Sequence, residues 1–301
     1  MANRSWRQTS GRRRGEALRC GCRRLANLKA VTNQPIARRT KISVVVPSYN
    51  SATFLGEALE SALSQEPAPY EVIVQDGGST DGSLEILRSF ANRVRWRSEP
   101  DGGQAQALNK AIAGASGDVV VWLNADDLLV PGAFAAVERA YTEHPHADFV
   151  YGNFDMIRAD GNVMRRFESS PYDPDRVFTH GCYIFSGAMF FRRDLLERVG
   201  PFDERLHACM DLDYLLRIGD VNAIHLEMTV ARFRRSGLGK SSRIRRTFLL
   251  EAHEVRKRAA GGSRRRRLVG LLVDARDMVA LATEPVRYTR AWSAVRRGKR
   301  L

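Results

Sequence analysis

The chain has 301 residues, of which 44% are hydrophobic and 27% are charged, and its formal net charge is +14. The hydrophobic fraction is that of a soluble globular protein, and it excludes collagen-like, mucin-like and wholly disordered classes. A chain of this length exceeds the usual limit for one hydrophobic core, which predicts one large domain with extensions, or two domains.

Strands alternate with helices from residue 41 onward. Apolar runs predict buried strands at 42–46, 71–75, 94–96 and 118–123. Helices are expected at 52–65, 83–90 and 104–115, with a further helix that begins near Pro131. This alternation predicts an α/β fold with a mostly parallel central sheet flanked by helices and right-handed crossovers.

A polar loop follows each of the four predicted strands: PSYN at 47–50, DGGS at 76–79, DGGQ at 101–104 and NADD at 124–127. One such loop alone is typical of a turn. Because ligands bind at the carboxyl ends of the strands in open α/β sheets, four in register indicate a ligand site.

The chemistry of these loops favours a nucleotide bound through a cation. The dinucleotide fingerprint G-x-G-x-x-G and the phosphate loop G-x-x-x-x-G-K-[ST] are both absent, so the phosphates must be held in another way. The carboxylates of Asp126 and Asp127 predict an Mg²⁺ or Mn²⁺ site. A helix N-cap before Pro131 is the alternative for these two residues.

The basic residues are concentrated at the two ends of the chain. Residues 1–40 contain 11 Lys and Arg against one acid, and residues 235–301 contain 19 against five. Residues 41–234 therefore carry a net charge of −10. We expect the two ends, and not the acidic centre, to contact a polyanion.

The N-terminal region and the cysteines exclude several classes. Residues 1–40 lack the continuous apolar stretch of a secretory signal; a transit peptide, a flexible arm and a misassigned start all stay open. Cys20 and Cys22 are too close together for a zinc-binding pair. With Cys182 and Cys209 they are read as free thiols, which fit a reducing cytoplasm.

Ordered motifs in the centre resemble those of family-2 glycosyltransferases, which have the GT-A fold. ISVVVPSYN at 42–50 resembles their opening strand, and VIVQDGGSTDGS at 72–83 resembles their V-D-D-G-S-T-D motif, with Gln75 in place of one Asp. WLNADD at 122–127 resembles the metal-binding D-x-D motif in an N-x-D-D form. FDERLH at 202–207, followed by MDLDYLLR at 210–217, resembles the acceptor segment that carries the catalytic base.

The resemblance covers about 42–240 and implies roles for the loop residues. It implies that Tyr49 lies against the nucleobase of a nucleotide-diphospho-sugar and that Asp76 accepts hydrogen bonds from that base. Asp126 would bind Mn²⁺ or Mg²⁺, together with Asn124, which stands where many relatives have Asp, and with Asp127. For Asp127, the alternatives to metal binding are a contact with the ribose or the acceptor, or a role as a cap of the next segment. The donor site is further expected to contain Pro47, Asn50, Gly103, Gln104, Asn124 and Lys240.

The same resemblance makes Asp211 the catalytic base of an inverting transfer to a hydroxyl. Asp213 is two residues further along the helix and is expected to form a salt bridge or cap. Ser236 stands where relatives often have a His, so Lys240 or a nearby Arg is expected to neutralise the phosphates. Ser186-Gly187 stands where a Gln-Pro pair is frequent, which predicts an unusual acceptor pocket.

Several other residues have simpler interpretations. His180, His207 and His225 are expected to be structural histidines, and Trp122 is expected to belong to the core.

The expected organisation is a basic arm at 1–40, a GT-A domain at 41–240 and a basic helical tail at 241–301. The domain divides into a nucleotide-binding half at about 41–130 and an acceptor half at about 131–240. The tail mixes Arg clusters with apolar residues such as Val286, Tyr288 and Trp292, which fits amphipathic helices on an anionic inner leaflet; a solvated Arg-rich tail is the alternative. The stretch 268–282 is too short and too charged to span a bilayer.

The resulting hypothesis is a metal-dependent, inverting glycosyltransferase that adds single sugars, because the processive motif Q-x-x-R-W is absent. Its acceptor is expected to be a lipid-linked or nascent cell-surface glycan, at the cytoplasmic face of the cell membrane. The alternatives are a nucleic-acid-binding protein that acts through its basic ends, which the acidic centre disfavours, and a non-catalytic scaffold, which Asn124 and Ser236 make conceivable.

Overall fold

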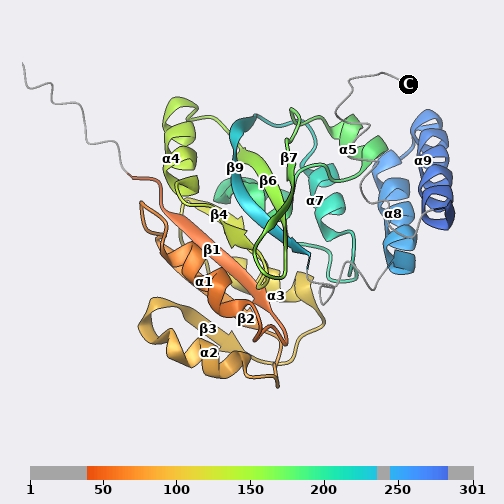
Figure 1. Ribbon diagram of the computed structural model, residues 1–301. Coiled ribbons are helices and arrows are strands. Elements are labelled where there is room, and N and C mark those ends of the chain that lie inside the picture. The colour runs from red at the N-terminus through yellow and green to blue at the C-terminus, as the bar shows by residue number, and fades with distance from the viewer. Residues whose placement is uncertain (1–38, 236–244, 284–301) are drawn as a thin grey trace, which may run out of the picture. The chain divides into compact units, whose positions relative to one another are not determined.

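The structure is a computed structural model that describes residues 39–235 and 245–283 (Figure 1). The basic arm up to residue 38, with Cys20 and Cys22, and the end of the tail from residue 284, with Val286, Tyr288 and Trp292, lie outside the described residues.

The described strands are β1 (Ile42–Ser48), β2 (Glu71–Asp76), β3 (Arg95–Ser98), β4 (Val119–Trp122), β5 (Leu128–Leu129), β6 (Phe149–Arg158), β7 (Val163–Phe167), β8 (Met189–Arg192) and β9 (Ala223–Arg235). The described α-helices are α1 (Leu55–Leu63), α2 (Ser83–Ser89), α3 (Gln104–Ala113), α4 (Ala133–Glu143), α5 (Pro174–His180), α6 (Arg193–Val199), α7 (Met210–Ile218), α8 (Arg245–Ala260) and α9 (Arg264–Thr283). Two short 3₁₀ helices are η1 (Ala91–Arg93) and η2 (Ser186–Ala188). The elements predicted from the sequence differ from these by at most three residues at either end.

The described strands form one sheet in the order β3-β2-β1-β4-β8-β6-β9-β5, and β7 pairs with β6 beside this path. The first four strands are parallel, as predicted. Beyond them the sheet is mixed, because β8 runs antiparallel to both β4 and β6, whereas β6 and β9 are parallel. The parallel half is the half whose carboxyl ends carry the four polar loops.

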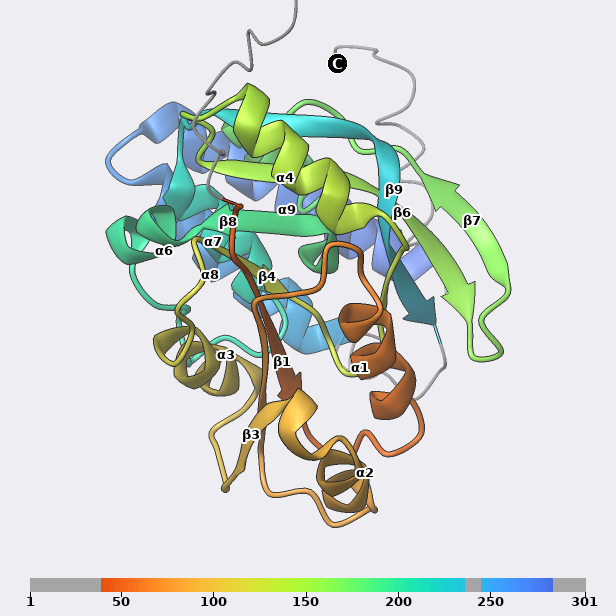
Figure 2. The same cartoon turned by 90° about the vertical axis from the view of Figure 1, so that its left-hand side faces the viewer.

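Strand β1 is buried along its whole length because helices cover both faces of the sheet. Val44 and Val46 point into one core with Phe134 of α4, and Val45 points into a second core with Leu108 of α3. Successive side chains of a strand point to opposite faces, so an unbroken apolar run serves both cores. Figure 2 shows α1 and α3 on opposite sides of β1.

The C-terminal helices α8 and α9 pack against each other, and they contact the domain through α7 and α5 (Figure 1). The helical form expected for this part of the tail is confirmed for residues 245–260 and 264–283. None of the helices in the described ranges combines the length and the apolar content that a bilayer crossing requires.

Candidate active site

Asp76 organises the loop that follows β2. Its side chain is fully buried, and Oδ2 accepts hydrogen bonds from the N–H groups of Gly78 (3.0 Å) and Ser79 (2.9 Å) and from Oγ of Ser98 (2.7 Å). Oδ1 accepts a hydrogen bond from Ser79 Oγ. Asp76 therefore holds this loop in position. The direct contact with a nucleobase that was expected for Asp76 stays a prediction.

The loops after β1 and β2 are tied together through Asn50. Its N–H donates to Ser79 Oγ (2.7 Å), and its Oδ1 accepts from the N–H of Thr80 (2.9 Å). Asn50 has a φ of 48°, a left-handed conformation that asparagine tolerates. Pro47 is buried within β1, whereas Tyr49 is 64% exposed beside this joint, an unusual position for a large aromatic side chain.

The third loop brings the start of α3 to the end of β4. Gly103 has a φ of 124°, which favours glycine, and a Cβ at this position would lie 3.5 Å from Nδ1 of His207 in the acceptor segment. Gln104, the first residue of α3, donates from Nε2 to Oδ1 of Asn124 (2.8 Å). The sequence predicted both residues at the donor site. In the structure Gln104 contacts Asn124, which was also predicted there, and Gly103 lies beside His207.

The three predicted metal ligands lie in one loop, but two of them already have partners. Oδ1 of Asn124 accepts hydrogen bonds from Trp122 Nε1 (2.7 Å) and from Gln104, and Nδ2 donates to Oδ2 of Asp127 (2.7 Å). A carbonyl oxygen has two lone pairs, and both are used here. Asp127 is fully buried, and its Oδ1 accepts from the N–H of Arg234 (2.8 Å).

Asp126 differs from its two neighbours. Within the described residues no other side chain bonds to its carboxylate, and the side chain is partly exposed. Burial raises the pKa of Asp126 despite the positive charge of Arg234. Burial and the charge of Asp126 together raise the pKa of Asp127 well above its ordinary value. Asp126 thus offers an available oxygen ligand, and Asp127 holds the loop.

A divalent cation fits this arrangement only if it shares its ligands with a substrate. Over the described ranges no three His, Cys, Asp or Glu side chains are grouped as a metal site. Mg²⁺ is, however, commonly bound by one or two carboxylates together with substrate phosphates. Asp126 can serve as such a ligand, and Asn124 could do so only by giving up a hydrogen bond.

Arg234, at the end of β9, connects the loop at 124–127 to the rest of the domain. Its buried guanidinium donates from Nε to the carbonyl oxygen of Asp126 (2.9 Å) and from Nη1 to that of Ala159 (2.7 Å), and it pairs with Glu57 of α1. It also lies over the ring of Phe54, 4.5 Å from the centroid. The sequence did not single out Arg234, because the spacing of the arginines does not indicate which one is buried beside the two aspartates.

Asp211, the predicted base, lies in the first turn of α7. Its Oδ1 accepts the N–H of Leu212 (2.8 Å), and the neighbouring thiol of Cys182 acts to lower the pKa of its carboxyl. Burial raises the pKa of Asp211, and the negative charge of Glu251 adds to this rise. A higher pKa makes a carboxylate a stronger base, which is the property that proton abstraction needs.

The loop that leads into α7 is held by Glu251 of α8. Its carboxylate accepts three successive N–H groups, those of His207 (2.8 Å), Ala208 (2.7 Å) and Cys209 (3.0 Å). Successive N–H groups that converge in this way form an anion-binding concavity. Glu251 lies 42 to 44 positions after its partners, so nothing in the local sequence pattern indicated it.

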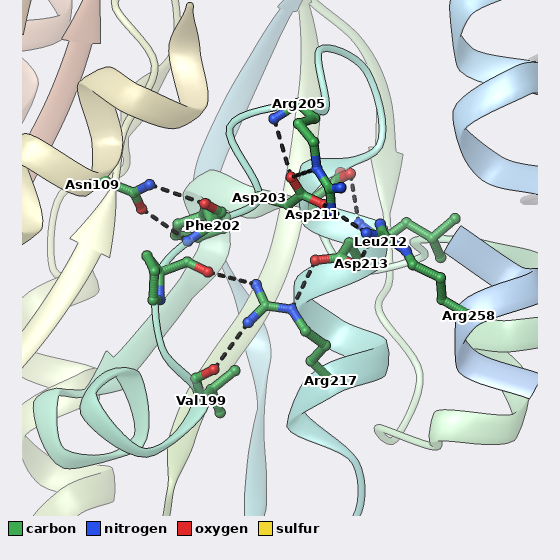
Figure 3. Close-up of polar contacts among 11 residues, drawn as sticks. Asn109, Val199, Phe202, Asp203, Arg205, Asp211, Leu212, Asp213, Arg217 and Arg258 are labelled. Carbon is green, nitrogen blue, oxygen red and sulfur yellow. Dashed lines mark hydrogen bonds and ion pairs between the residues drawn. The ribbon is translucent and has the colours of Figure 1, made fainter. Parts of the chain in front are cut away.

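Two aspartates near Asp211 form ion pairs (Figure 3). Asp213 pairs with Arg217 (2.8 Å) and with Arg258 of α8 (3.1 Å), which confirms the salt bridge expected for it. Asp203 pairs with Arg205 (2.9 Å) and Arg258 (2.6 Å), and these arginines hold the pKa of Asp203 well below its ordinary value. Arg258 therefore joins the acceptor segment to α8.

The remaining predicted residues have structural positions or are not described. Trp122 is buried, as predicted, and His225 stacks on Tyr151 while Nε2 contacts Oδ1 of Asn153 (2.9 Å). Nδ1 of His180 contacts the hydroxyl of Thr179. Ser186 and Gly187 are buried in η2. Lys240 and Ser236 lie outside the described residues.

Comparison with solved structures gives the class of fold. TarS of S. aureus, solved in complex with UDP-GlcNAc, matches 79% of this chain and 71% of its own chain with a TM-score of 0.60 and 20% identity. A mannosyltransferase of Pyrobaculum calidifontis, solved with GDP-Man and Mn²⁺, matches 86% of this chain and 79% of its own chain with a TM-score of 0.56 and 21% identity. The chain has the GT-A fold of these glycosyltransferases, and the predicted fold is confirmed.

The sequence comparison gives the family. Residues 43–200 match the family described as glycosyl transferase family 2, and the chain belongs to it. A PGL/p-HBAD biosynthesis glycosyltransferase of Mycobacterium bovis is 29% identical over 69% of this chain and 82% of its own length. An uncharacterized glycosyltransferase of Rickettsia conorii is 29% identical over 64% of this chain, which spans only a third of that relative's length.

Proposed function

We propose that this protein transfers a sugar from a nucleotide-diphospho-sugar to a hydroxyl acceptor, with inversion at the anomeric carbon. The observation that carries the proposal is the gathering of polar loops at the carboxyl edge of β3-β2-β1-β4, with the Asp126 carboxylate left unbonded by other side chains in the described part of the chain. Membership of glycosyl transferase family 2 supports it.

The donor half binds the nucleotide through the loops after β1 and β2. Tyr49, which is largely exposed, offers an aromatic face on which a nucleobase stacks. Asn50 and Asp76 keep the loops in position, and Pro47 fixes the end of β1. Gly103 and Gln104 approach the diphosphate from the start of α3, and Asn124 orients Gln104 through their shared hydrogen bond. We retain Lys240 as the phosphate-neutralising residue of this proposal.

Asp126 would hold the cation, Mn²⁺ or Mg²⁺. When bound, such a cation stabilises the negative charge of the departing nucleoside diphosphate. Asp127 and Arg234 position Asp126 by fixing the loop on both sides.

Asp211 takes the proton from the acceptor hydroxyl. As that oxygen forms its bond to the anomeric carbon, the bond from this carbon to the diphosphate oxygen breaks on the opposite face. The proton ends on the Asp211 carboxylate, and the bonding electrons leave with the diphosphate. Burial prepares Asp211 for this role, since it raises the pKa of the carboxyl.

The acceptor we propose is a lipid-linked or nascent cell-surface glycan, reached from the cytoplasmic face of the membrane. The basic composition of the C-terminal helices supports a position at an anionic surface. A single addition per acceptor remains part of the proposal.

The test is a thermal-shift panel of UDP-, GDP- and dTDP-sugars, with Mn²⁺ and with chelator, followed by donor hydrolysis. A donor at 100 times its Kd adds about 2.7 kcal/mol to the free energy of unfolding. We expect one class of donor to raise the Tm only with the cation, and Asp126→Asn to lose that difference. Asp175→Asn, at an exposed site in α5, is the matched control.

No shift with any donor would overturn the proposal. A shift without turnover of donor or acceptor would favour the non-catalytic scaffold.

A further inference from the structure

Helix α9 turns its two acidic residues toward α8. Arg256 of α8 is almost completely buried, and it pairs with Asp274 and with Asp277 (3.0 Å), the two acidic residues of α9. His253 of α8 contacts Asp274 through Nδ1 (2.7 Å). Arg256 Nε also donates to the carbonyl oxygen of Phe178 in α5 (3.2 Å). These contacts fix which side of α9 faces the domain.

The opposite side of α9 is apolar and exposed. Leu268, Leu271, Leu272 and Met278 are between 56% and 64% exposed. Their spacing of three, four and ten residues places them on one side of a helix. We call this set the outer face of α9. A helix on the surface of a globular protein normally shows the reverse arrangement, with its apolar side buried.

The outer face is bordered by basic residues and has no acidic ones. Arg264, Arg265 and Arg267, in the first turn of α9, are exposed. Both acids of α9 point to Arg256, so among the described side chains at 264–279 the exposed side offers only apolar and positively charged groups. This combination is typical of helices that lie in the interface of an anionic bilayer.

We propose that the outer face of α9 lies on an anionic lipid surface, with the helix parallel to the membrane. The four apolar side chains enter the boundary between head groups and acyl chains, and the arginines of the first turn contact the lipid phosphates. A second copy of this chain fits the face less well, because it would set one acid-free basic surface against another. The inference refines the membrane association within the proposed function, and its test does not depend on catalysis.

The geometry of the helix pair supports this orientation. The ion pairs of Arg256 hold α9 on α8, and α8 is joined to the acceptor segment through Glu251 and Arg258. A membrane beneath the outer face would therefore lie on the side of α9 away from α8. The apolar side chains need no rearrangement to reach it.

The experiment measures sedimentation of the full chain with vesicles of phosphatidylcholine alone or mixed with phosphatidylglycerol. We expect wild-type protein to sediment with the mixed vesicles. The variant Leu268→Ser, Leu271→Ser, Leu272→Ser should bind them at least about tenfold more weakly. The variant Arg264→Ser, Arg265→Ser, Arg267→Ser should lose about a hundredfold in its preference for mixed over neutral vesicles.

The control is Val163→Ser with Met164→Ser in β7, which removes exposed apolar side chains at a distant element and should leave binding unchanged. The donor-induced thermal shift checks folding of every variant, and it separates failure of this inference from failure of the proposed function. Wild-type binding to mixed vesicles by the leucine variant would overturn the proposal. A wild-type dimer that becomes a monomer in that variant would also overturn it, and would assign the face to a second copy.

Discussion

Asp211 is the side chain whose replacement tests the proposed chemistry most directly. A positioned base contributes about 10²–10⁴-fold to a rate. We expect Asp211→Asn to lower kcat by that amount and to leave the Kd of the donor within about twofold, since the donor loops do not involve this residue. Initial rates and donor titrations measure the two quantities.

The control for Asp211 is Asp213→Asn in the same helix. It removes the ion pairs with Arg217 and Arg258, so it should lower the Tm while kcat stays near the wild-type value. The two variants therefore separate loss of the base from loss of helix stability. Equal turnover in Asp211→Asn and wild type would contradict the assignment.

Arg234 is the residue whose replacement should lower the free energy of unfolding most. Its guanidinium is fully buried and serves two backbone carbonyl groups, those of Asp126 and Ala159, which would be left without donors in Arg234→Met. We expect this variant to lose roughly 3 kcal/mol of unfolding free energy. Urea denaturation measures the change.

Glu57, the ion-pair partner of Arg234, provides a comparison variant for the change in unfolding free energy. Glu57 is largely exposed, so Glu57→Gln should cost less than about 1 kcal/mol. Arg234→Lys should not restore stability, because a single ammonium group cannot reproduce the forked geometry. A loss in Arg234→Met as small as that in Glu57→Gln would show that the carbonyl groups find other donors.

At the scale of elements, α8 should influence Asp211, the proposed base, through the charge of Glu251. Glu251→Gln keeps the shape of the side chain but removes the charge that raises the pKa of Asp211. Because the base acts in its ionised form, the rate rises with pH through this pKa. We expect the acidic limb of the kcat profile to move to lower pH in Glu251→Gln.

Cys182→Ala should change the pKa of Asp211 in the direction opposite to Glu251→Gln. The thiol of Cys182 lowers the pKa of Asp211, so its removal should move the acidic limb to higher pH. A purely structural role for Glu251 would lower the Tm and leave the limb in place. If the acidic limb moved in the same direction in Glu251→Gln and in Cys182→Ala, the opposite effects that we assign to these two residues would be contradicted.

The elements also show how far the sequence could predict this fold. The four parallel strands and their loops were predictable because each one is signalled locally, by an apolar run and a polar end. The position of β8 between β4 and β6 could not be predicted. Its MFFR sequence fits any buried strand, and its neighbours in the sheet are set by distant residues.

The same distinction holds at the site. The sequence indicated Asp126 and Asp211 through motifs that resemble those of a family. Glu251 and Arg234 act across long distances in the chain, and only the folded arrangement shows which glutamate or arginine is used. The partners of Asn124 were also invisible in the sequence, because a hydrogen bond from Gln104 depends on the approach of α3 to β4.

At the scale of the whole molecule, the charge is divided between an acidic centre and basic ends, and this division predicts how the protein treats nucleic acid. At a physiological ionic strength of about 0.15 M, we expect random-sequence duplex to leave donor turnover unchanged. Any binding should weaken steeply with added salt, because it would come from phosphate neutralisation alone. Competition by duplex for the donor would favour the nucleic-acid-binding alternative. Fluorescence anisotropy with labelled duplex, run beside the turnover assay, measures both effects.

Asn109 of α3 contacts the main chain of Phe202 in both directions: Nδ2 donates to the carbonyl oxygen (3.0 Å), and Oδ1 accepts the N–H (2.8 Å). This reciprocal pair, visible in Figure 3, lies directly after the end of the family match at residue 200. The side-chain amide of Asn109 thus joins the segment that carries Asp211 to the half that carries the polar loops. The same Nδ2 also donates to Oε1 of Glu204 (3.0 Å), so a segment exchanged between relatives must keep a carboxylate at this position as well as the two main-chain contacts. Grafting chimaeras with new acceptor preferences should therefore begin at Phe202.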